Sequence, residues 1–142
     1  MFSSISNEWE TPQEFFDKLN DEFHFTLDPC CTKENYKCDK FYTIEDDGLT
    51  RGWGGETVFV NPPYGREIGK WVKKCYEENS NHGVTCVMLI PSRTDTKWFH
   101  KYIYGKAEIR FIEGRLKFVN KSQEKTMSAP FPSMVVIFRK SA

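Results

Sequence analysis

The feature that most constrains the fold is a short apolar run that stops at two prolines. Residues 57–60 are β-branched or aromatic, which is typical of a buried β-strand. The chain continues with Asn61-Pro62-Pro63-Tyr64, and neither proline can extend a strand, because each has a fixed φ and no N–H. The chain must therefore leave the sheet in a rigid, extended turn. That turn lies at the carboxyl end of a strand, where open α/β sheets bind their ligands.

The residue types in this turn suit an exocyclic amino group on a planar heterocycle. The Asn61 side-chain oxygen and the Pro62 carbonyl can accept both hydrogens of such a group, while the Tyr64 ring stacks on the heterocycle. Pro63 shapes the turn. Two acceptors favour a pyramidal nitrogen, so positioning and electrostatics supply the rate in place of a strong base. The structural alternative is a plain Pro-Pro turn, with Asn61 as a cap and Tyr64 in the core.

Strands and helices alternate through residues 57–112, which argues for a mostly parallel sheet with right-handed crossovers. Further strands are expected at 23–27, 84–90, 107–112, 116–119 and 134–138, with a short one near residues 41–42. The last strands can pair antiparallel at one edge. Residues 120–132 are polar and contain prolines, so they are expected to form a loop.

Three helices are expected. The first covers 12–22 and follows Thr11-Pro12-Gln13-Glu14, a capping-box pattern with proline at the first helical position. The second covers about 67–78, with apolar residues at helical spacing. A short third helix contains residues 98–102, and Thr94 or Asp95 is its expected cap.

Charge is unevenly distributed along the chain, although the formal net charge is zero. Residues 1–50 carry a net charge of −8, and residues 51–142 carry +8. This asymmetry predicts that the later part faces an anion, for which nucleic acid is the natural candidate. The alternative is that these cations form ordinary solvated faces.

Composition excludes several other classes. No stretch approaches the ~20 apolar residues of a membrane span, and the N-terminus lacks the layout of a signal peptide. The expected location is therefore the cytoplasm. The five cysteines form no zinc-binding pattern, so we expect reduced thiols and no metal site.

The order of motifs resembles the phage Dam-type DNA N6-adenine methyltransferases. The resemblance extends from Trp9 to about Phe138 and is carried by five segments: Trp9-Glu10-Thr11-Pro12, Leu27-Asp28-Pro29, Asn61-Pro62-Pro63-Tyr64-Gly65, Pro91 to Thr96 with Trp98-Phe99, and Gly114-Arg115-Leu116-Lys117-Phe118. It implies one methyltransferase domain over 1–142, with no separate target-recognition domain. The implied fold is an abbreviated Rossmann-like α/β sheet, mostly parallel with an antiparallel edge strand and helices on both faces.

The resemblance also implies S-adenosylmethionine as cofactor. Trp9, Thr11 and Pro12 lie where such enzymes have their N-terminal cofactor motif, and Asp28, Pro29 and Cys30 lie where they have the main cofactor loop. Asp28 is placed to accept a hydrogen bond from the cofactor's ammonium group. Asp46 or Asp47 resembles the acidic residue that holds the cofactor's adenine, and Asn61 belongs to both sites. The structural alternative for these residues is ordinary caps and turns.

The sequence departs from the general methyltransferase pattern at two points. Residues 28–39 contain no glycine, although the cofactor loop of such enzymes normally does. The span 29–60 is short for two full strand–helix units, so we expect one or two early elements to be reduced to loops.

The expected DNA contacts come from segments that follow the predicted strands. Arg93 is expected at the carboxyl end of the strand 84–90, on the same side as Asn61 if the sheet is parallel. The DNA-binding candidates are Arg66, Ser92, Arg93, Thr94, Lys97 and Arg115.

The sequence therefore predicts methyl transfer to the N6 group of adenine in DNA, with the base flipped out of the helix and the enzyme a monomer or homodimer. Other candidate substrates are an RNA base and a protein glutamine amide. A non-catalytic nucleic-acid-binding module is a further alternative, which the missing loop glycines favour.

Overall fold

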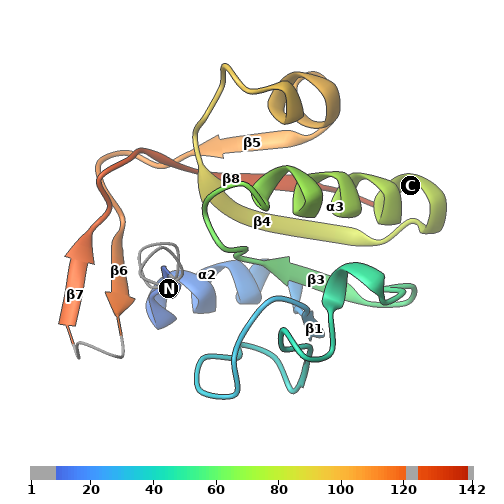
Figure 1. The fold of residues 1–142 in the computed structure, drawn as a ribbon, viewed down its shortest axis with the longest axis horizontal. Helices are drawn as coiled ribbons and strands as arrows, with labels where there is room; N and C mark the ends of the chain where they lie inside the picture. Colours follow the sequence, from blue (N-terminus) through green and yellow to red (C-terminus); the bar gives the residue numbers. More distant parts are fainter. Residues whose placement is uncertain (1–8, 121–124, 141–142) are drawn as a thin grey trace.

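The computed structural model describes residues 9–120 and 125–140 and is built on a six-stranded sheet (Figure 1). The strand order is β2-β1-β3-β4-β8-β5. The strands of this sheet are β1 (Leu27–Asp28), β2 (Lys40–Phe41), β3 (Thr57–Val60), β4 (Thr85–Pro91), β5 (Glu108–Phe111) and β8 (Ser133–Phe138). The helical elements are α2 (Gln13–Phe23), the 3₁₀ turn η1 (Gly48–Thr50), α3 (Ile68–His82) and the π-helical turn η2 (Phe99–Ile103).

The pairing confirms a mostly parallel α/β sheet. The strands β2, β1, β3 and β4 pair in parallel, and β3 is aligned with β4 so that Val60 lies opposite Met88. At the other side of the sheet, β8 is antiparallel to both β4 and the edge strand β5. The expected antiparallel edge is thus present. Because β3 and β4 are parallel, the segments that follow them leave the sheet at the same end.

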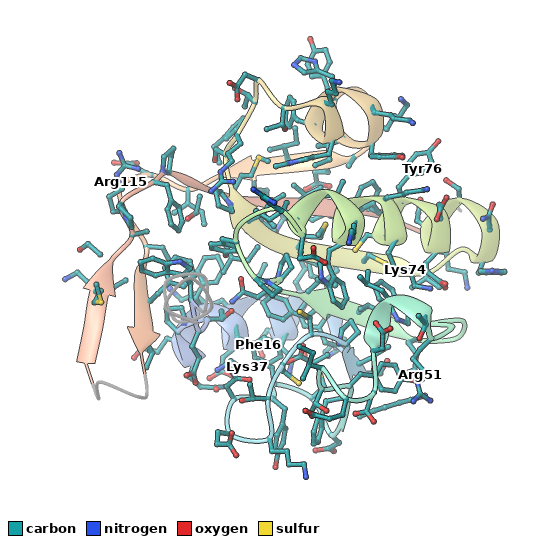
Figure 2. All side chains as sticks on the ribbon, viewed as in Figure 1. Phe16, Lys37, Arg51, Lys74, Tyr76 and Arg115 are labelled. Carbon is teal, nitrogen blue, oxygen red and sulfur yellow. The ribbon has the colours of Figure 1, made fainter. Side chains whose placement is uncertain are left out.

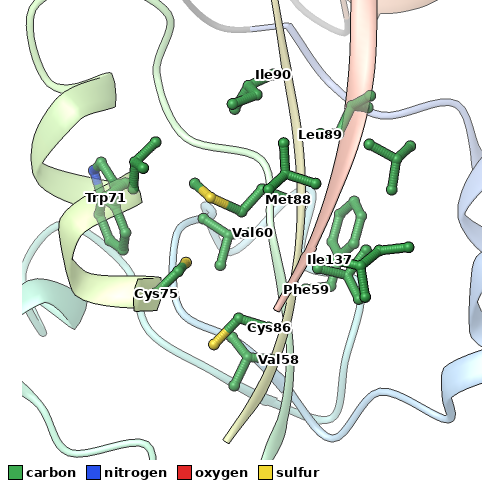
Figure 3. Close-up of a cluster of buried hydrophobic side chains, with 14 of the residues drawn as sticks. Val58, Phe59, Val60, Trp71, Cys75, Cys86, Met88, Leu89, Ile90 and Ile137 are labelled. Carbon is green, nitrogen blue, oxygen red and sulfur yellow. The ribbon is translucent and has the colours of Figure 1, made fainter. Parts of the chain in front are cut away.

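Helices cover both faces of the sheet, as expected. Figure 3 shows Trp71 and Cys75 of α3 on one side of β3 and β4, together with Met88, and Phe59 on the other side. On that second face, the Phe59 ring packs edge-on against Phe16 of α2, with ring centroids 5.1 Å apart. None of the helices in the described part of the chain has the length and apolar character needed to cross a bilayer.

The early part of the sheet is reduced, as the short span predicts. Strands β1 and β2 have two residues each, and residues 29–56 otherwise form loops and η1. The expected strand over 23–27 is wrong except at its last residue. His24 adopts a left-handed φ of 57° and ends α2, and the Phe25 N–H donates to the Asn20 side chain. These local bonds use the backbone groups that a longer strand would need.

A two-stranded hairpin extends away from the main sheet (Figure 1). It consists of β6 (Lys117–Asn120) and β7 (Lys125–Ser128), which pair antiparallel. The expectation of a loop over 120–132 is therefore wrong for β7, while residues 121–124 lie outside the described residues. The polar composition of β7 does not predict a strand. Its stability comes from pairing with β6, whose Phe118 is buried.

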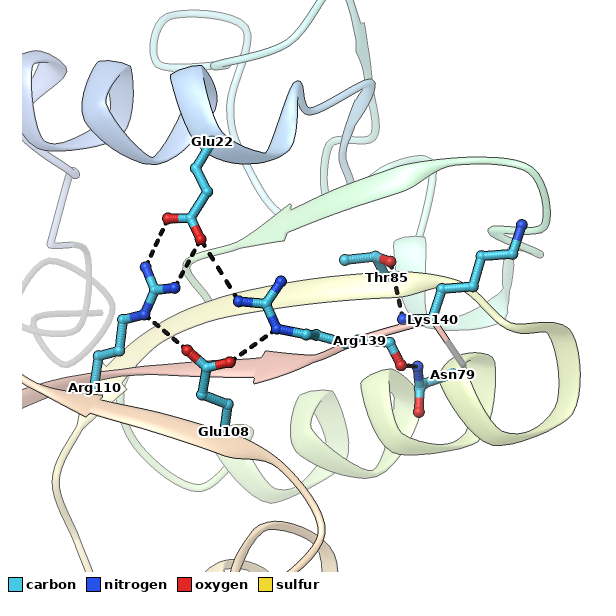
Figure 4. Close-up of polar contacts among 7 residues, drawn as sticks. All are labelled: Glu22, Asn79, Thr85, Glu108, Arg110, Arg139 and Lys140. Carbon is cyan, nitrogen blue, oxygen red and sulfur yellow. Dashed lines mark hydrogen bonds and ion pairs between the residues drawn. The ribbon is translucent and has the colours of Figure 1, made fainter. Parts of the chain in front are cut away.

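An ion-pair network joins α2 to the edge strand (Figure 4). The Arg110 guanidinium donates to both oxygens of Glu22 and to Glu108, and Arg139 donates to Glu108. The arginines lower the pKa values of both carboxyl groups. All four side chains are at least 39% exposed, so solvent screens the network and its contribution to stability is small.

Candidate active site

A cavity of about 1040 Å³ lies at the carboxyl ends of β1 and β3. Most of its wall residues come from four segments that are distant in sequence: the N-terminal segment 9–11, the loop after β1, the loop 43–49 and the turn 61–63. Figure 2 labels Lys37, a wall residue on the loop between β1 and β2. An open α/β sheet is expected to bind its ligand at this position, and the volume accommodates a nucleoside-sized molecule with further groups attached.

Asn61 lines this cavity and is held at both ends of its amide. Its Nδ2 donates to the Trp9 carbonyl at 2.5 Å and to the Thr11 hydroxyl at 2.9 Å. Its Oδ1 accepts from the Tyr64 hydroxyl at 2.6 Å. A carboxamide oxygen can accept two hydrogen bonds, so one lone pair of Oδ1 remains for a ligand.

Tyr64 belongs to the core and does not line the cavity. Its ring is 2% exposed and packs edge-on against Phe118 and Phe131, with centroids 6.0 and 5.4 Å away. Burial raises the pKa of its hydroxyl, which therefore stays protonated and shares its hydrogen between Asn61 Oδ1 and the Leu89 carbonyl. The stacking of this ring on the target base stays a prediction, and here the ring packs in the core away from the cavity. The hydroxyl instead holds the catalytic candidate Asn61.

We expect Tyr64→Phe to lower kcat by about tenfold, because Asn61 Oδ1 loses the donor that fixes it while the ring packing stays intact. The free energy of unfolding should fall by about 1 kcal/mol as the Leu89 carbonyl loses its partner. Steady-state kinetics of the methyl transfer predicted from the sequence and thermal unfolding measure the two effects. An unchanged kcat would show that the Tyr64 hydroxyl does not contribute to turnover and that only the packing of the ring is needed.

The expected capping box at the start of α2 is wrong. Pro12 is the N-cap residue, and no side chain among the described residues caps the helix. Thr11 is 3% exposed, and its hydroxyl accepts from Asn61 instead. Thr11 and Trp9 both line the cavity, whereas Pro12 does not. The proline still ends the segment and starts the helix, because its fixed φ of −58° suits that position.

Asp28 is the most buried carboxyl group at the cavity, with 3% exposure. Its Oδ1 accepts from the Cys30 N–H at 3.3 Å and its Oδ2 from the Lys37 N–H at 3.0 Å. These two bonds close the loop that follows β1. Burial raises the pKa of Asp28 to about 7, against the lowering effect of these N–H groups. Pro29 and Cys30 also line the cavity, so the structure brings all three predicted residues of this loop to it.

Only one of the two expected acidic residues in the loop 43–49 reaches the cavity. Asp47 lines it, with a left-handed φ of 54°. Asp46 does not, because its Oδ2 accepts from both the N–H and the hydroxyl of Thr43 and so closes the turn. These bonds lower the pKa of Asp46. Asp46 therefore shapes the loop, and Asp47 is the residue available to a ligand.

Gly48 is a site residue that the sequence analysis missed. A Cβ at this position would lie 2.2 Å from the Pro29 carbonyl oxygen, so no side chain fits there. Gly48 thus allows the loop 43–49 to touch the loop after β1. The only available signal was a glycine directly after an acidic run.

Gly48→Ala is expected to push the two loops apart, since the Cβ meets backbone and not a flexible side chain. The cost should be about 1–3 kcal/mol of folding stability, with weaker cofactor binding. Gly54→Ala is the matched control, because nothing lies within 4 Å of its Cβ position. Thermal unfolding and calorimetry of cofactor binding compare the two variants; equal behaviour would contradict the close approach.

The charge of the cavity wall favours a cationic ligand. Two lysines face six carboxyl side chains, which are Glu10, Asp28, Glu34, Glu45, Asp47 and Glu67. The wall also carries large apolar side chains, among them Leu49, Phe59 and Trp71. This combination suits a ligand with an onium charge and an apolar ring system.

The predicted DNA-binding residues lie outside the cavity. Arg66 follows β3 and the segment 92–97 follows β4, so both leave the sheet at the end where Asn61 lies. Figure 2 shows Arg115 close to the hairpin. Arg66, Arg93, Lys97 and Arg115 are exposed and form no ion pair with the residues that the structure describes.

Ser92 and Thr94 are the other two DNA-binding candidates in the segment after β4. The Thr94 carbonyl lies 2.8 Å from a His100 ring nitrogen, and the Ser92 hydroxyl is buried without a partner among the described residues. The expected cap of the helix at 98–102 is wrong, because the Thr96 hydroxyl, not Thr94 or Asp95, accepts from the Phe99 N–H.

All five cysteines are free. Cys30 and Cys31 line the cavity, and burial raises the pKa of both thiols. At neutral pH they are therefore protonated and poor nucleophiles. Within the described residues, no group of His, Cys, Asp and Glu side chains could hold a metal ion.

Residues 2–142 match the family model described as DNA N-6-adenine-methyltransferase (Dam). The chain is 33% identical over 138 residues to the DNA N-6-adenine-methyltransferase of Haemophilus phage HP1, covering 94% of this chain and 79% of that protein. It is 36% identical over 115 residues to the protein of the same description from Escherichia phage T1, covering 80% of this chain but only 48% of that protein.

Proposed function

Because this chain belongs to the Dam family of DNA N-6-adenine-methyltransferases, we propose that it transfers a methyl group from S-adenosylmethionine to the N6 amino group of adenine in DNA. The observation that carries the proposal is the placement of Asn61. Its amide oxygen keeps a free lone pair at the edge of a large cavity with an acidic wall. The phage relatives supply the substrate class, and host cytoplasm is the expected location if a phage carries the gene.

The residues present fit S-adenosylmethionine. When bound, it supplies an electrophilic methyl group on a sulfonium ion. The acidic wall favours that positive charge, and the buried Asp28 carboxylate suits an ammonium group. Asp47 is available for the adenine amino group, and the apolar wall residues suit the ring. Pro29, Cys30 and Gly48 shape the space between these groups.

Asn61 and the Pro62 carbonyl would orient the target amine. Each accepts one of its hydrogens, which favours a pyramidal nitrogen with its lone pair directed into the cavity. Pro63 keeps the Pro62 carbonyl rigid, and Tyr64 holds Asn61. The adenine must leave the base stack to reach these acceptors, because its amino group is otherwise paired inside the duplex.

The exposed cations at the same end of the sheet would hold the DNA backbone. Arg66, Arg93, Lys97 and Arg115 lack partners within the described residues, so phosphates can neutralise them. Ser92 and Thr94 would contribute through the loop after β4. Contacts of this kind position the duplex without reading its sequence.

The test is transfer of tritiated methyl groups to DNA, RNA and protein in parallel, followed by nucleoside analysis. We expect label in DNA, recovered as N6-methyladenine. Label in RNA or in protein glutamine would show that the substrate is RNA or protein and not DNA. Cofactor binding without transfer to any of the three would identify a binding module that kept the fold.

A further inference from the structure

We propose that Thr11 is a positioning residue for methyl transfer, which together with the Trp9 carbonyl turns the oxygen of the Asn61 amide, and not its nitrogen, toward the target amine. This inference rests on the proposed function. It assigns Thr11 a role beyond contact with the cofactor, since it acts on the reacting group through Asn61.

The hydrogen-bond pattern around Asn61 allows a single orientation of its amide. The two N–H bonds of Nδ2 point at two oxygens, the Trp9 carbonyl and the Thr11 hydroxyl. The Trp9 carbonyl can only accept, so a flipped amide would place two oxygens against each other without a hydrogen. On the opposite side, the Tyr64 hydroxyl donates to Oδ1. With a flipped amide, the Tyr64 hydroxyl would have to accept from the Asn61 nitrogen and could donate only to the Leu89 carbonyl, so the Trp9 carbonyl is the group that excludes the flip.

This orientation matters for the reaction because the two ends of an amide have opposite polarity. An amine with two hydrogens needs an acceptor, which only Oδ1 provides. An NH₂ group in its place would repel the target and leave the nitrogen planar. Without the Thr11 hydroxyl, one N–H of Asn61 loses its partner at a half-buried position, and the amide is held less firmly.

The segment that carries Thr11 is itself fixed. Glu10 exchanges two backbone hydrogen bonds with Val119 of β6, at 3.3 and 3.0 Å. The Trp9 ring packs edge-on against Phe118 and Phe131, with centroids 5.7 and 5.4 Å away. The two acceptors are therefore held by the base of the hairpin on one side and by the start of α2 on the other. They form a stationary support for Asn61.

The test compares Thr11→Val, which keeps the shape but removes the acceptor, with Thr11→Ser, which keeps the hydroxyl. We expect Thr11→Val to lower kcat on adenine-containing DNA about tenfold and to leave the Kd for S-adenosylmethionine within about twofold. Thr11→Ser should retain kcat. Both variants are also placed in an Asn61→Ala background, where Thr11→Val should cause no further loss because the group it positions is gone.

Several results would overturn the inference. Wild-type kcat in Thr11→Val would do so, as would a raised cofactor Kd with unchanged kcat, which would restrict Thr11 to cofactor binding. A full tenfold loss on top of Asn61→Ala would show that Thr11 acts elsewhere. If Thr11→Val does not fold, Thr11→Ala serves in the same comparison. Absence of adenine methylation by the wild-type protein would refute the proposed function itself, whereas the results above concern an active enzyme.

Discussion

Asn61→Ala is expected to lower kcat by about 10²–10³-fold, the scale of removing one preorganised polar group from a reaction centre. The free lone pair of Oδ1 disappears, and the Pro62 carbonyl alone cannot fix both hydrogens of the amine. Cofactor affinity should change far less, because the main wall residues for the cofactor belong to other loops. Single-turnover methylation and calorimetry measure the two effects.

Asn79→Ala is a matched control for the stability part of this change. The Asn79 Nδ2 also bridges two acceptors, the Val84 and Arg139 carbonyls at 3.0 and 2.7 Å. Asn79 lies next to the start of β4, whereas Asn61 follows β3 at the end of the sheet where β4 finishes. Both variants should lose about 1–2 kcal/mol of folding stability, since each loses the two hydrogen bonds that its Nδ2 donates, and Asn61→Ala also loses the bond from the Tyr64 hydroxyl. Only Asn61→Ala should lose turnover. Near-normal kcat in Asn61→Ala would refute its catalytic role.

The second large effect concerns Asp28, whose pKa burial raises to about 7. A bound ammonium group favours the ionised carboxylate, so cofactor affinity should rise as the pH increases from 6 to 7.5. Asp28→Asn should lower affinity at pH 7.5 about 10–100-fold and remove this rise, because a charged hydrogen bond is lost. Titration calorimetry across this pH range tests both statements, and buffers of different ionisation enthalpy report the proton that Asp28 releases.

Asp47→Asn is the control that removes a negative charge from the cavity while it keeps Asp28, the group expected to titrate. Asp47 lines the same cavity but is exposed, so its loss should weaken cofactor binding without removing the rise between pH 6 and 7.5. A pH-independent affinity in the wild-type protein would exclude Asp28 as the ammonium partner.

Asp28 also makes folding stability depend on pH. Its carboxyl group ionises near 3.8 when unfolded and near 7 when folded, so the folded state holds more protons between these values. Stability from this group is therefore present below about pH 4 and falls as the pH rises to about 7. Asp28→Asn should flatten that part of the stability profile, as thermal unfolding at several pH values would show.

Much of the fold follows from local pattern in the sequence. The strand 57–60 and its end before the two prolines were predicted at the residues where they occur, because proline has no N–H to donate to a sheet. The helix over 67–78 was recognised from its apolar stripe, although it continues to His82, where Gly83 ends it with a left-handed φ of 65°. Strand β7 was missed because nothing in its own composition distinguishes it from a loop.

The candidate site was predicted less completely, for a physical reason. Asn61 was expected from its position after a strand, and Asp28 and Asp47 from the resemblance to the family's cofactor motifs; all three line the cavity. Contacts between distant segments could not be predicted in this way. The fit of Gly48 against Pro29 depends on how two loops pack, which no local pattern encodes.

The sequence by itself determined where the chain must leave the sheet and which polar groups it presents there, because proline geometry and hydrophobic periodicity act over a few residues. Only the tertiary structure decided what those groups bind. It brought Thr11 within 2.9 Å of Asn61 across 50 residues, and it turned the Tyr64 ring into the core so that its hydroxyl meets the same amide. Those contacts depend on how α2, the hairpin and β3 pack together, since a hydrogen bond forms only where packing has already placed donor and acceptor.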